Sequence, residues 1–353
     1  MTGHSAIRLS WFRLDQLSAN GNRPELVDVH GVTRTPCPAA RGSAPTHLRS
    51  CSAMNRYEQF RSAALDRDIP GDEVDKFSDQ LRFAIWASTG GAEEESVGQL
   101  GGLPRLPVGV EWPGGEDYPL PFVGSVDCAA LPRVEGFALP EDGSLLLFLH
   151  HEEDMEEHSP LGGSAYAQAL YVPAGTDTAV APPPSGHDTA TFFHENIPFL
   201  IPERRLSAWV QPVLPDWIED RDVEFESDTV KQLFDELKHL DELCALVGEL
   251  WPAQDRYAAL RLGGYGREIG GQDGPWTQMA SVNIGDRPGG SDVQRAEWFR
   301  RLHEEEFRLR REWVPLAQFP TESDVYYGCF LISTDDLADR RFDRMRSFTM
   351  FTE

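Results

Sequence analysis

The chain has 353 residues, 40% of them hydrophobic, and is long enough to bury a substantial core. Its 58 acidic and 32 basic residues give a formal net charge of -26, which repels nucleic-acid phosphates and anionic lipid headgroups. Nucleic acid and membrane surfaces are therefore excluded as expected partners. Solubility alone explains such a charge, and we favour that explanation over a dedicated surface for cations.

Cysteine spacing and hydropathy bear on the location of the protein. The five cysteines include no C-x-x-C pair, so neither a disulfide framework nor a zinc ribbon is predicted. No apolar run approaches the roughly 18 residues of a transmembrane helix, and the first residues lack the apolar core of a signal peptide. We therefore expect a cytoplasmic protein.

Residues 1–53 differ in composition from the rest of the chain. They carry six arginines against three acidic residues, are rich in Ser, Pro, Gly and Ala, and show no helix or strand periodicity. This composition predicts a disordered segment or a mistaken upstream translation start. The folded body is expected over residues 54–353.

The body opens with helical periodicity and continues with strands. Apolar residues at helical spacing over 57–64 and 74–81 predict two short helices, which lead into a strand at 83–86. Short apolar runs between Gly and Pro residues then predict strands at 122–126, 145–149, 167–172 and 206–210.

Two longer helices follow. An apolar stripe from Val230 to Val247 predicts one helix over residues 229–250, ended by Pro252. A capping-box spacing at Ser291-x-x-Gln294 opens the second helix, which ends before Pro315. Its Glu and Arg residues four apart, among them the pair Glu304 and Arg308, predict a largely exposed surface. A last strand is expected at 326–332. These elements together predict an α+β fold, mostly antiparallel sheet with peripheral helices.

Paired glycines and nearby apolar strands carry a family resemblance. The residues concerned are Gly101-Gly102-Leu103-Pro104-Arg105-Leu106-Pro107, Trp112-Pro113, Leu120 to Val126, Gly143 to Phe148, Leu262-Gly263-Gly264-Tyr265, Gln272, Pro315-Leu316-Ala317-Gln318, Gly328 to Ile332 and Asp335-Asp336-Leu337. In these positions the sequence resembles the YwqG-like family of uncharacterised bacterial proteins, over roughly 83–342. The resemblance agrees with the α+β fold.

The same residues suggest a diverged internal duplication. The approximate halves, 80–215 and 255–345, each contain a double glycine, an apolar strand and a further strand opened by a glycine, with the helix 229–250 between them. The first half departs from the pattern at Gly124, where the resemblance implies a glutamine similar to Gln318.

Gly101, Gly102, Gly263, Gly264 and Gln318 are the candidate ligand-binding residues. Paired glycines suit a tight strand connection, because only glycine adopts positive φ without steric cost. We favour that structural interpretation over a ligand-cradling loop. No lysine follows a glycine loop, so no phosphate-binding P-loop is predicted. Trp86, Trp112 and Trp209 are expected to anchor the sheet core rather than to stack on ligands.

The segment from His150 to His158 is the candidate metal site. His150, His151, Glu153 and His158 supply imidazole and carboxylate groups, which bind zinc or manganese. No ligand geometry follows from this spacing, and we favour a solvated hairpin loop.

The sequence contains no nucleophile, redox or cofactor motif. We therefore expect a non-enzymatic binding or protein-interaction module without a cofactor, whose acidic surface suits a basic protein such as a toxin or a regulatory protein. The alternative is a metal-assisted hydrolase that uses a divalent ion held by His150, His151, Glu153 and His158.

Overall fold

A computed structural model describes residues 55–90, 94–115, 118–157, 165–185, 187, 197–224, 226–267, 274–321 and 326–351. The interpretation of residues 1–53 as a disordered or wrongly started segment lies outside these residues, as do His158 and Gln272 of the candidate motifs.

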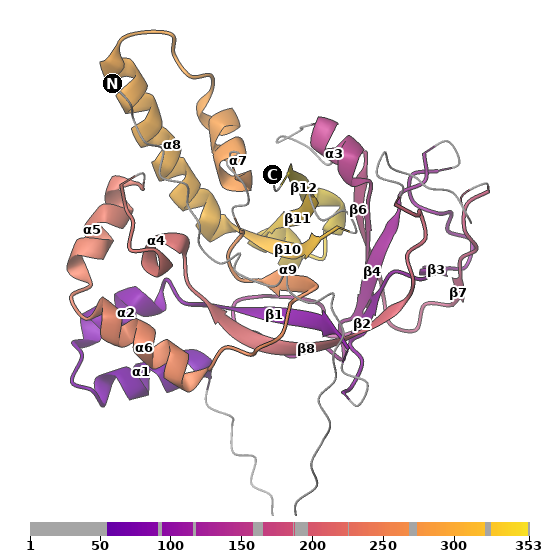
Figure 1. Ribbon diagram of the computed structural model, residues 1–353, viewed down its shortest axis with the longest axis horizontal. Coiled ribbons are helices and arrows are strands. Elements are labelled where there is room, and N and C mark those ends of the chain that lie inside the picture. Colours follow the sequence, from indigo (N-terminus) through magenta and orange to yellow (C-terminus); the bar gives the residue numbers. More distant parts are fainter. Residues whose placement is uncertain are drawn as a thin grey trace, which may run out of the picture. The chain divides into compact units, whose positions relative to one another are not determined.

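The described chain forms one large antiparallel sheet and one small one. The strands are β1 (Arg82–Thr89), β2 (Gly98–Leu100), β3 (Arg105–Pro107), β4 (Phe122–Asp127), β5 (Ser144–Leu149), β6 (Ala167–Val172), β7 (Thr178–Val180), β8 (Arg204–Val213), β9 (Leu260–Gly263), β10 (Trp313–Pro320), β11 (Tyr326–Ser333) and β12 (Arg346–Phe351). The large sheet has the order β12-β11-β10-β9-β1-β8-β2-β4-β5-β6, and β3 pairs with β7 (Figure 1). All pairs are antiparallel, which confirms the predicted α+β fold.

Helices flank the sheet. They are α1 (Arg56–Leu65), α2 (Gly71–Ser78), α3 (His151–Glu157), α4 (Asp216–Glu219), α5 (Asp228–Glu236), α6 (Leu240–Leu250), α7 (Pro275–Ile284), α8 (Asp292–Glu312) and α9 (Thr334–Ala338), with a 3₁₀ turn at Phe342–Arg344. Helices α1, α2 and α6 pack together, and α7 packs along α8 (Figure 1). Of the helices in the described ranges, none is long and apolar enough to cross a membrane.

The prediction of one helix over residues 229–250 is wrong, because two helices, α5 and α6, occupy that segment. The break lies at Leu237, whose ψ of 82° is not helical. It allows the backbone N–H of His239 to donate to one carboxylate oxygen of Glu73 on α2 at 2.6 Å. Nδ1 of the His239 ring forms a hydrogen bond of 2.7 Å with the other oxygen. Glu73 is buried, so these bonds compensate for its removal from water.

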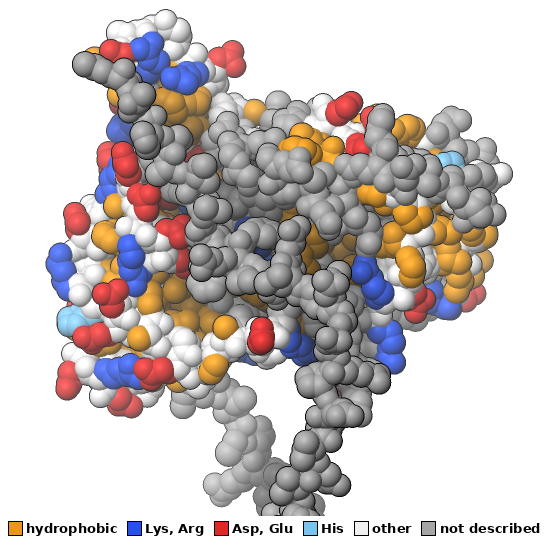
Figure 2. Space-filling view, viewed as in Figure 1, with side chains coloured by type: hydrophobic (Ala, Val, Ile, Leu, Met, Phe, Trp, Pro, Cys, Tyr) orange, Lys and Arg blue, Asp and Glu red, His pale blue; other side chains and the backbone are white. Residues whose placement is uncertain are grey.

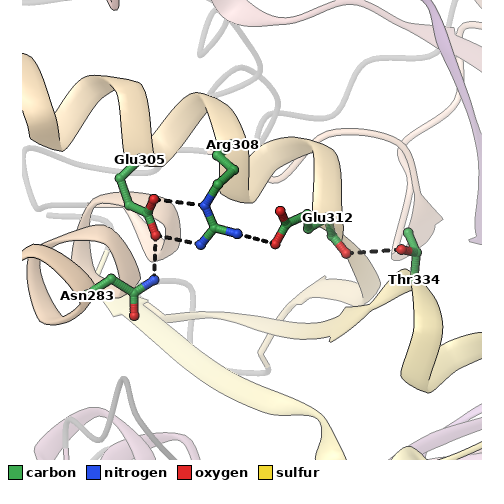
Figure 3. Close-up of polar contacts among 5 residues, drawn as sticks. All are labelled: Asn283, Glu305, Arg308, Glu312 and Thr334. Carbon is green, nitrogen blue, oxygen red and sulfur yellow. Dashed lines mark hydrogen bonds and ion pairs between the residues drawn. The ribbon is translucent and has the colours of Figure 1, made fainter.

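Helix α8 has the predicted start but different ion pairs. The capping box of Ser291 and Gln294 is formed. Arg308 pairs with Glu305 at 2.6 Å and with Glu312, rather than with Glu304, which accepts from the Thr229 hydroxyl instead. Figure 3 shows that Glu305 contacts both Arg308 and Asn283 on α7, which donates to it at 2.7 Å.

The strand order is symmetric about the central pair β1 and β8. On each side follow a short strand, β9 or β2, and then three strands in chain order. The double glycines occupy equivalent places, since Gly263 ends β9 and Gly101 directly follows β2. The next strand carries a bulge in both halves, between Pro315 and Ala317 in β10 and between Phe122 and Gly124 in β4. This agreement supports an internal duplication.

The strand register shows that the residue equivalent to Gln318 is one position later than the sequence pattern indicates. Gln318 pairs with Arg261, two residues before Gly263. Ser125 pairs with Gln99, two residues before Gly101. Ser125, and not Gly124, is therefore equivalent to Gln318. The same comparison of strand registers makes Ser88 of β1 equivalent to Ser207 of β8. These two serines are also direct cross-strand partners.

In each half, a segment that follows a strand packs against the last strand of the other half. After β5, helix α3 places Asp154 against β12, where the hydroxyls of Ser347 and Thr349 donate to it at 2.5 and 2.8 Å. After β11, the ring of Phe342 packs 5.5 Å from Tyr171 on β6. The two halves are thus joined at their outer strands as well as at the centre of the sheet.

Candidate functional site

A pocket of about 260 Å³ lies at one end of the large sheet, where β1, β2, β5 and β10 end and β4 and β8 begin. We call it the end pocket. Its lining residues are Thr89, Leu100, Pro121, Phe122, Val123, Leu149, His151, Ile197, Pro198, Phe199, Ile201, Arg204, Tyr257, Ala259, Phe319, Pro320 and Thr321. Both halves of the sheet therefore contribute to one wall.

Most of the residues that line the end pocket are apolar, and polar groups lie among them. Bending of the sheet brings its distant strands together, because a Cβ built on Gly328 of β11 would lie 2.8 Å from Leu149 of β5. The guanidinium of Arg204, the imidazole of His151 and the hydroxyls of Thr89 and Thr321 are among the polar groups of the lining. Such a lining binds the apolar body of a ligand and orients it through a few polar contacts.

His151 belongs to a helix with one buried face rather than to a solvated loop, so the loop interpretation is wrong for residues 151–157. His150, His151 and Asp154 are buried although the run is strongly acidic. The Asp154 backbone donates to the His150 carbonyl at 3.0 Å, which starts the helix. The buried side of the helix meets β11 and β12, where the His151 ring lies 4.7 Å from the Tyr326 ring.

Burial keeps both histidines neutral near pH 7. It lowers the pKa of His151 to about 3, and His150 contributes further to that shift. It also lowers the pKa of His150 to about 4, although Glu153 acts in the opposite direction. Neutral imidazoles can accept or donate a hydrogen bond but add no charge to the site.

Of the candidate metal site, His150, His151 and Glu153 are described, and these three residues do not form one ligand set. The His150 ring stacks on Tyr118 at 5.3 Å, whereas the His151 ring packs on Tyr326. Glu153 lies beside the Tyr118 hydroxyl. Burial of Tyr118 and its hydrogen bond to Glu153 raise the pKa of that hydroxyl. Within the described ranges no group of three or more His, Cys, Asp or Glu residues could hold a metal ion. His158 lies outside those ranges.

The double glycines have the backbone conformation that the structural interpretation requires. Gly101, Gly102, Gly263 and Gly264 have φ of 63°, 73°, 75° and 75°. A Cβ on Gly101 would lie 2.6 Å from the Pro202 carbonyl, so the segment beside the end pocket packs directly on this glycine. None of the four lines the pocket, although Leu100, next to Gly101, does.

Gln318 forms hydrogen bonds with the loop that follows the second double glycine. It is fully buried, donates to the Tyr265 carbonyl at 3.1 Å and accepts from the Arg267 backbone N–H at 2.9 Å. In the first half Gln99 reaches the equivalent carbonyl, that of Leu103, at 3.4 Å. A glutamine thus supports each loop, from β10 in one half and from β2 in the other. The ligand-binding role of these five residues stays a prediction.

Comparison with protein families supplies a classification. Residues 98–349 match the family described as a domain of unknown function, DUF1963. The chain belongs to the DUF1963 family. The DUF1963 match begins in β2 and ends in β12, so it includes every lining residue of the end pocket except Thr89. A search among curated proteins gives no match.

Sequence reasoning missed most of the end pocket. Its wall includes Phe199, Ile201 and Tyr257, which lie in connections between strands, and Arg204, which begins β8, and none of these residues belongs to a motif. The pocket exists because the bent antiparallel sheet gathers the same end of many strands, and that bend is not visible in a single sequence. Among the lining residues, the sequence predicted only His151 as a site residue, and it did so as a candidate metal ligand.

Proposed function

We propose that this DUF1963 protein is a non-enzymatic binding protein whose end pocket holds a small, mainly apolar molecule. The pocket itself supports the proposal, because it is concave, is lined mostly by apolar residues and joins both halves of the sheet. Its volume of about 260 Å³ is close to the lower end of the roughly 300 to 1,000 Å³ typical of ligand sites, which favours a small ligand.

The polar groups of the end pocket suit binding better than chemistry. Arg204 offers a charge and His151 a neutral ring, while Thr89 and Thr321 offer hydroxyls. Burial lowers the pKa of His151 to about 3, whereas a general base is most efficient when its pKa lies near the working pH. The metal-assisted hydrolase remains a prediction that the described residues do not test.

Finer assignments are also proposals. The residues that resemble the YwqG-like family support membership of that narrower group, and the cytoplasm is the location we expect. A basic protein partner, such as a toxin or regulator, is supported by the net charge of -26. Figure 2 shows acidic side chains interspersed with basic ones over the helical side of the molecule. We therefore place a protein partner second to a small molecule.

Filling the end pocket tests the proposed function. Val123→Phe and Ile201→Phe each add a ring to its wall, whereas Val293→Phe adds the same ring to an exposed position on α8. The probe is the fluorescent dye anilinonaphthalene sulfonate, followed by displacement of the dye with a small-molecule library. We expect the two pocket variants to lose most dye binding while Val293→Phe retains it. Unchanged dye binding in both pocket variants would contradict the proposal.

A further inference from the structure

Two arginines and two tryptophans form a row across the middle of the large sheet. Arg261 on β9 is the cross-strand partner of Trp86 on β1, and Trp86 is the partner of Trp209 on β8. The Arg261 guanidinium lies 4.8 Å from the Trp86 ring, the two indoles are 6.2 Å apart, and the Arg256 guanidinium lies 5.2 Å from the Trp209 ring. We call these four residues the Arg–Trp ladder.

The Arg–Trp ladder contains buried donors without acceptors among the described residues. Trp86 Nε1, Trp209 Nε1 and Arg261 Nε are buried, and none of them has a hydrogen-bond partner within the described ranges. Buried polar groups are almost always hydrogen-bonded, since an unmade bond costs stability. All three groups are donors, so what they lack is an acceptor.

The two arginines of the ladder differ in their partners. Arg256 forms an ion pair with Glu94 at 2.8 Å and also donates to the Ser207 hydroxyl. Arg261 forms no ion pair with the described residues. Glu219 and Asp216 act on it only through space, and burial lowers the pKa of its guanidinium. An arginine nevertheless stays charged in proteins, and a buried charge is normally paired.

We propose that the Arg–Trp ladder binds a small molecule through an oxyanion group, a carboxylate or a phosphate. The Nε edge of a guanidinium presents parallel N–H groups that match two oxygens of such a group, and indole N–H groups can donate to its remaining oxygens. Arg261 and Trp86 are partly exposed as whole residues, although their three-atom donor set with Trp209 is buried. The ladder shares no residue with the lining of the end pocket, so a test of one site does not decide the other.

The first half lacks this arrangement, which argues against a purely structural need for it. The position equivalent to Arg261 is Gln99, whose amide donates to the Gly101 carbonyl at 2.9 Å. The position equivalent to Trp86 is Arg205. The same sheet geometry is therefore built with a hydrogen-bonded glutamine and an exposed arginine in one half, and with buried unsatisfied donors in the other.

Indole N–H signals in a nitrogen-15 NMR spectrum of the whole chain test the proposal. The probes are inorganic phosphate and succinate, each titrated to millimolar concentration in a low-salt buffer without other oxyanions. We expect the Trp86 and Trp209 signals, assigned with Trp→Phe variants, to shift in a saturable manner. Trp112 and Trp298 are internal controls, because they already donate to the carbonyls of Leu120 and Gly285. The anion that binds more tightly identifies the class of ligand.

Arg261→Met provides the decisive variant, with Arg300→Met on exposed α8 as its control. We expect Arg261→Met to weaken anion binding at least tenfold and to melt, without anion, at the wild-type temperature or above it, because it removes an unpaired buried charge. Three results would each overturn the proposal: no shift of Trp86 or Trp209 with either anion, equal anion affinity in Arg261→Met, or a lower melting temperature of Arg261→Met in anion-free buffer.

Discussion

At the scale of single residues, backbone conformation and close packing together explain the double glycines. Gly101 has φ of 63°, and an added Cβ would lie 2.6 Å from both Ile201 and the Pro202 carbonyl. Gly175 has φ of 79° but has open space around it. The two sites therefore separate the cost of positive φ from the cost of a steric clash.

We predict that Gly175→Ala lowers the free energy of unfolding by about 1–2 kcal/mol, from the left-handed backbone alone. Gly101→Ala should cost roughly 3 kcal/mol or more, because overpacking is added to the same strain. Urea denaturation of both variants measures the difference. Equal losses would show that the contact with the 201–202 segment contributes nothing.

We predict that buried His151 makes the protein less stable in mild acid. Its folded pKa of about 3 lies below the ordinary value of 6.5, so the unfolded chain binds more protons between these values. Stability is therefore fully present above pH 6.5 and falls as the pH falls, by up to about 1.4 kcal/mol per pH unit for one histidine. Urea midpoints of His151→Phe should decline less than wild type between pH 6.5 and 4.5.

His239 provides a control of opposite sign. Its hydrogen bond to Glu73 raises its pKa, so the stability that it contributes is present at low pH and is lost as the pH rises through the folded pKa. His239→Gln should therefore decline more steeply than wild type on acidification. If both variants follow the wild-type curve, the assigned pKa directions are wrong.

At the scale of elements, helix α3 shows how a charged sequence can hide a buried face. We predict that Asp154→Ala is strongly destabilising, since it leaves the Ser347 and Thr349 hydroxyls buried without their acceptor, at about 1–3 kcal/mol each. Glu156→Ala, on the exposed side of the same helix, should have little effect. Thermal denaturation compares the two, and similar melting temperatures would mean that α3 does not hold β12.

Most elements followed from periodicity, and those that did not have identifiable physical reasons. Helix α8 and strands such as β5 and β11 carry long or strongly apolar patterns, so they were predicted. Strands β2 and β9 have three and four residues, too few to show a period, yet they flank the central pair of strands. The break in residues 229–250 lies beside a contact with Glu73, which is far away in the sequence. The Arg–Trp ladder depends on strand register, which no single segment reveals.

At the scale of the whole described molecule, the two halves are interlocked. Strand β1, near the start of the described chain, pairs with β9 of the second half, and Asp154 crosses to β12. We predict that fragments 1–224 and 225–353 do not fold separately but form a one-to-one complex when co-expressed. Size-exclusion chromatography and circular dichroism check this outcome. A folded, soluble fragment 225–353 on its own would contradict it, because that fragment lacks the strand that covers β9.

The pairing of Ser88 with Ser207 has an evolutionary consequence. On a true two-fold axis between antiparallel strands, a residue faces its own copy in the second subunit, and these serines occupy that place within one chain. This is the geometry of a homodimer fused end to end. In a homodimer every mutation appears twice, so both subunits must keep the same surface. A single chain has no such restriction, and here Arg261 and Trp86 stand where the other half has Gln99 and Arg205. One copy can then specialise while its twin preserves the scaffold.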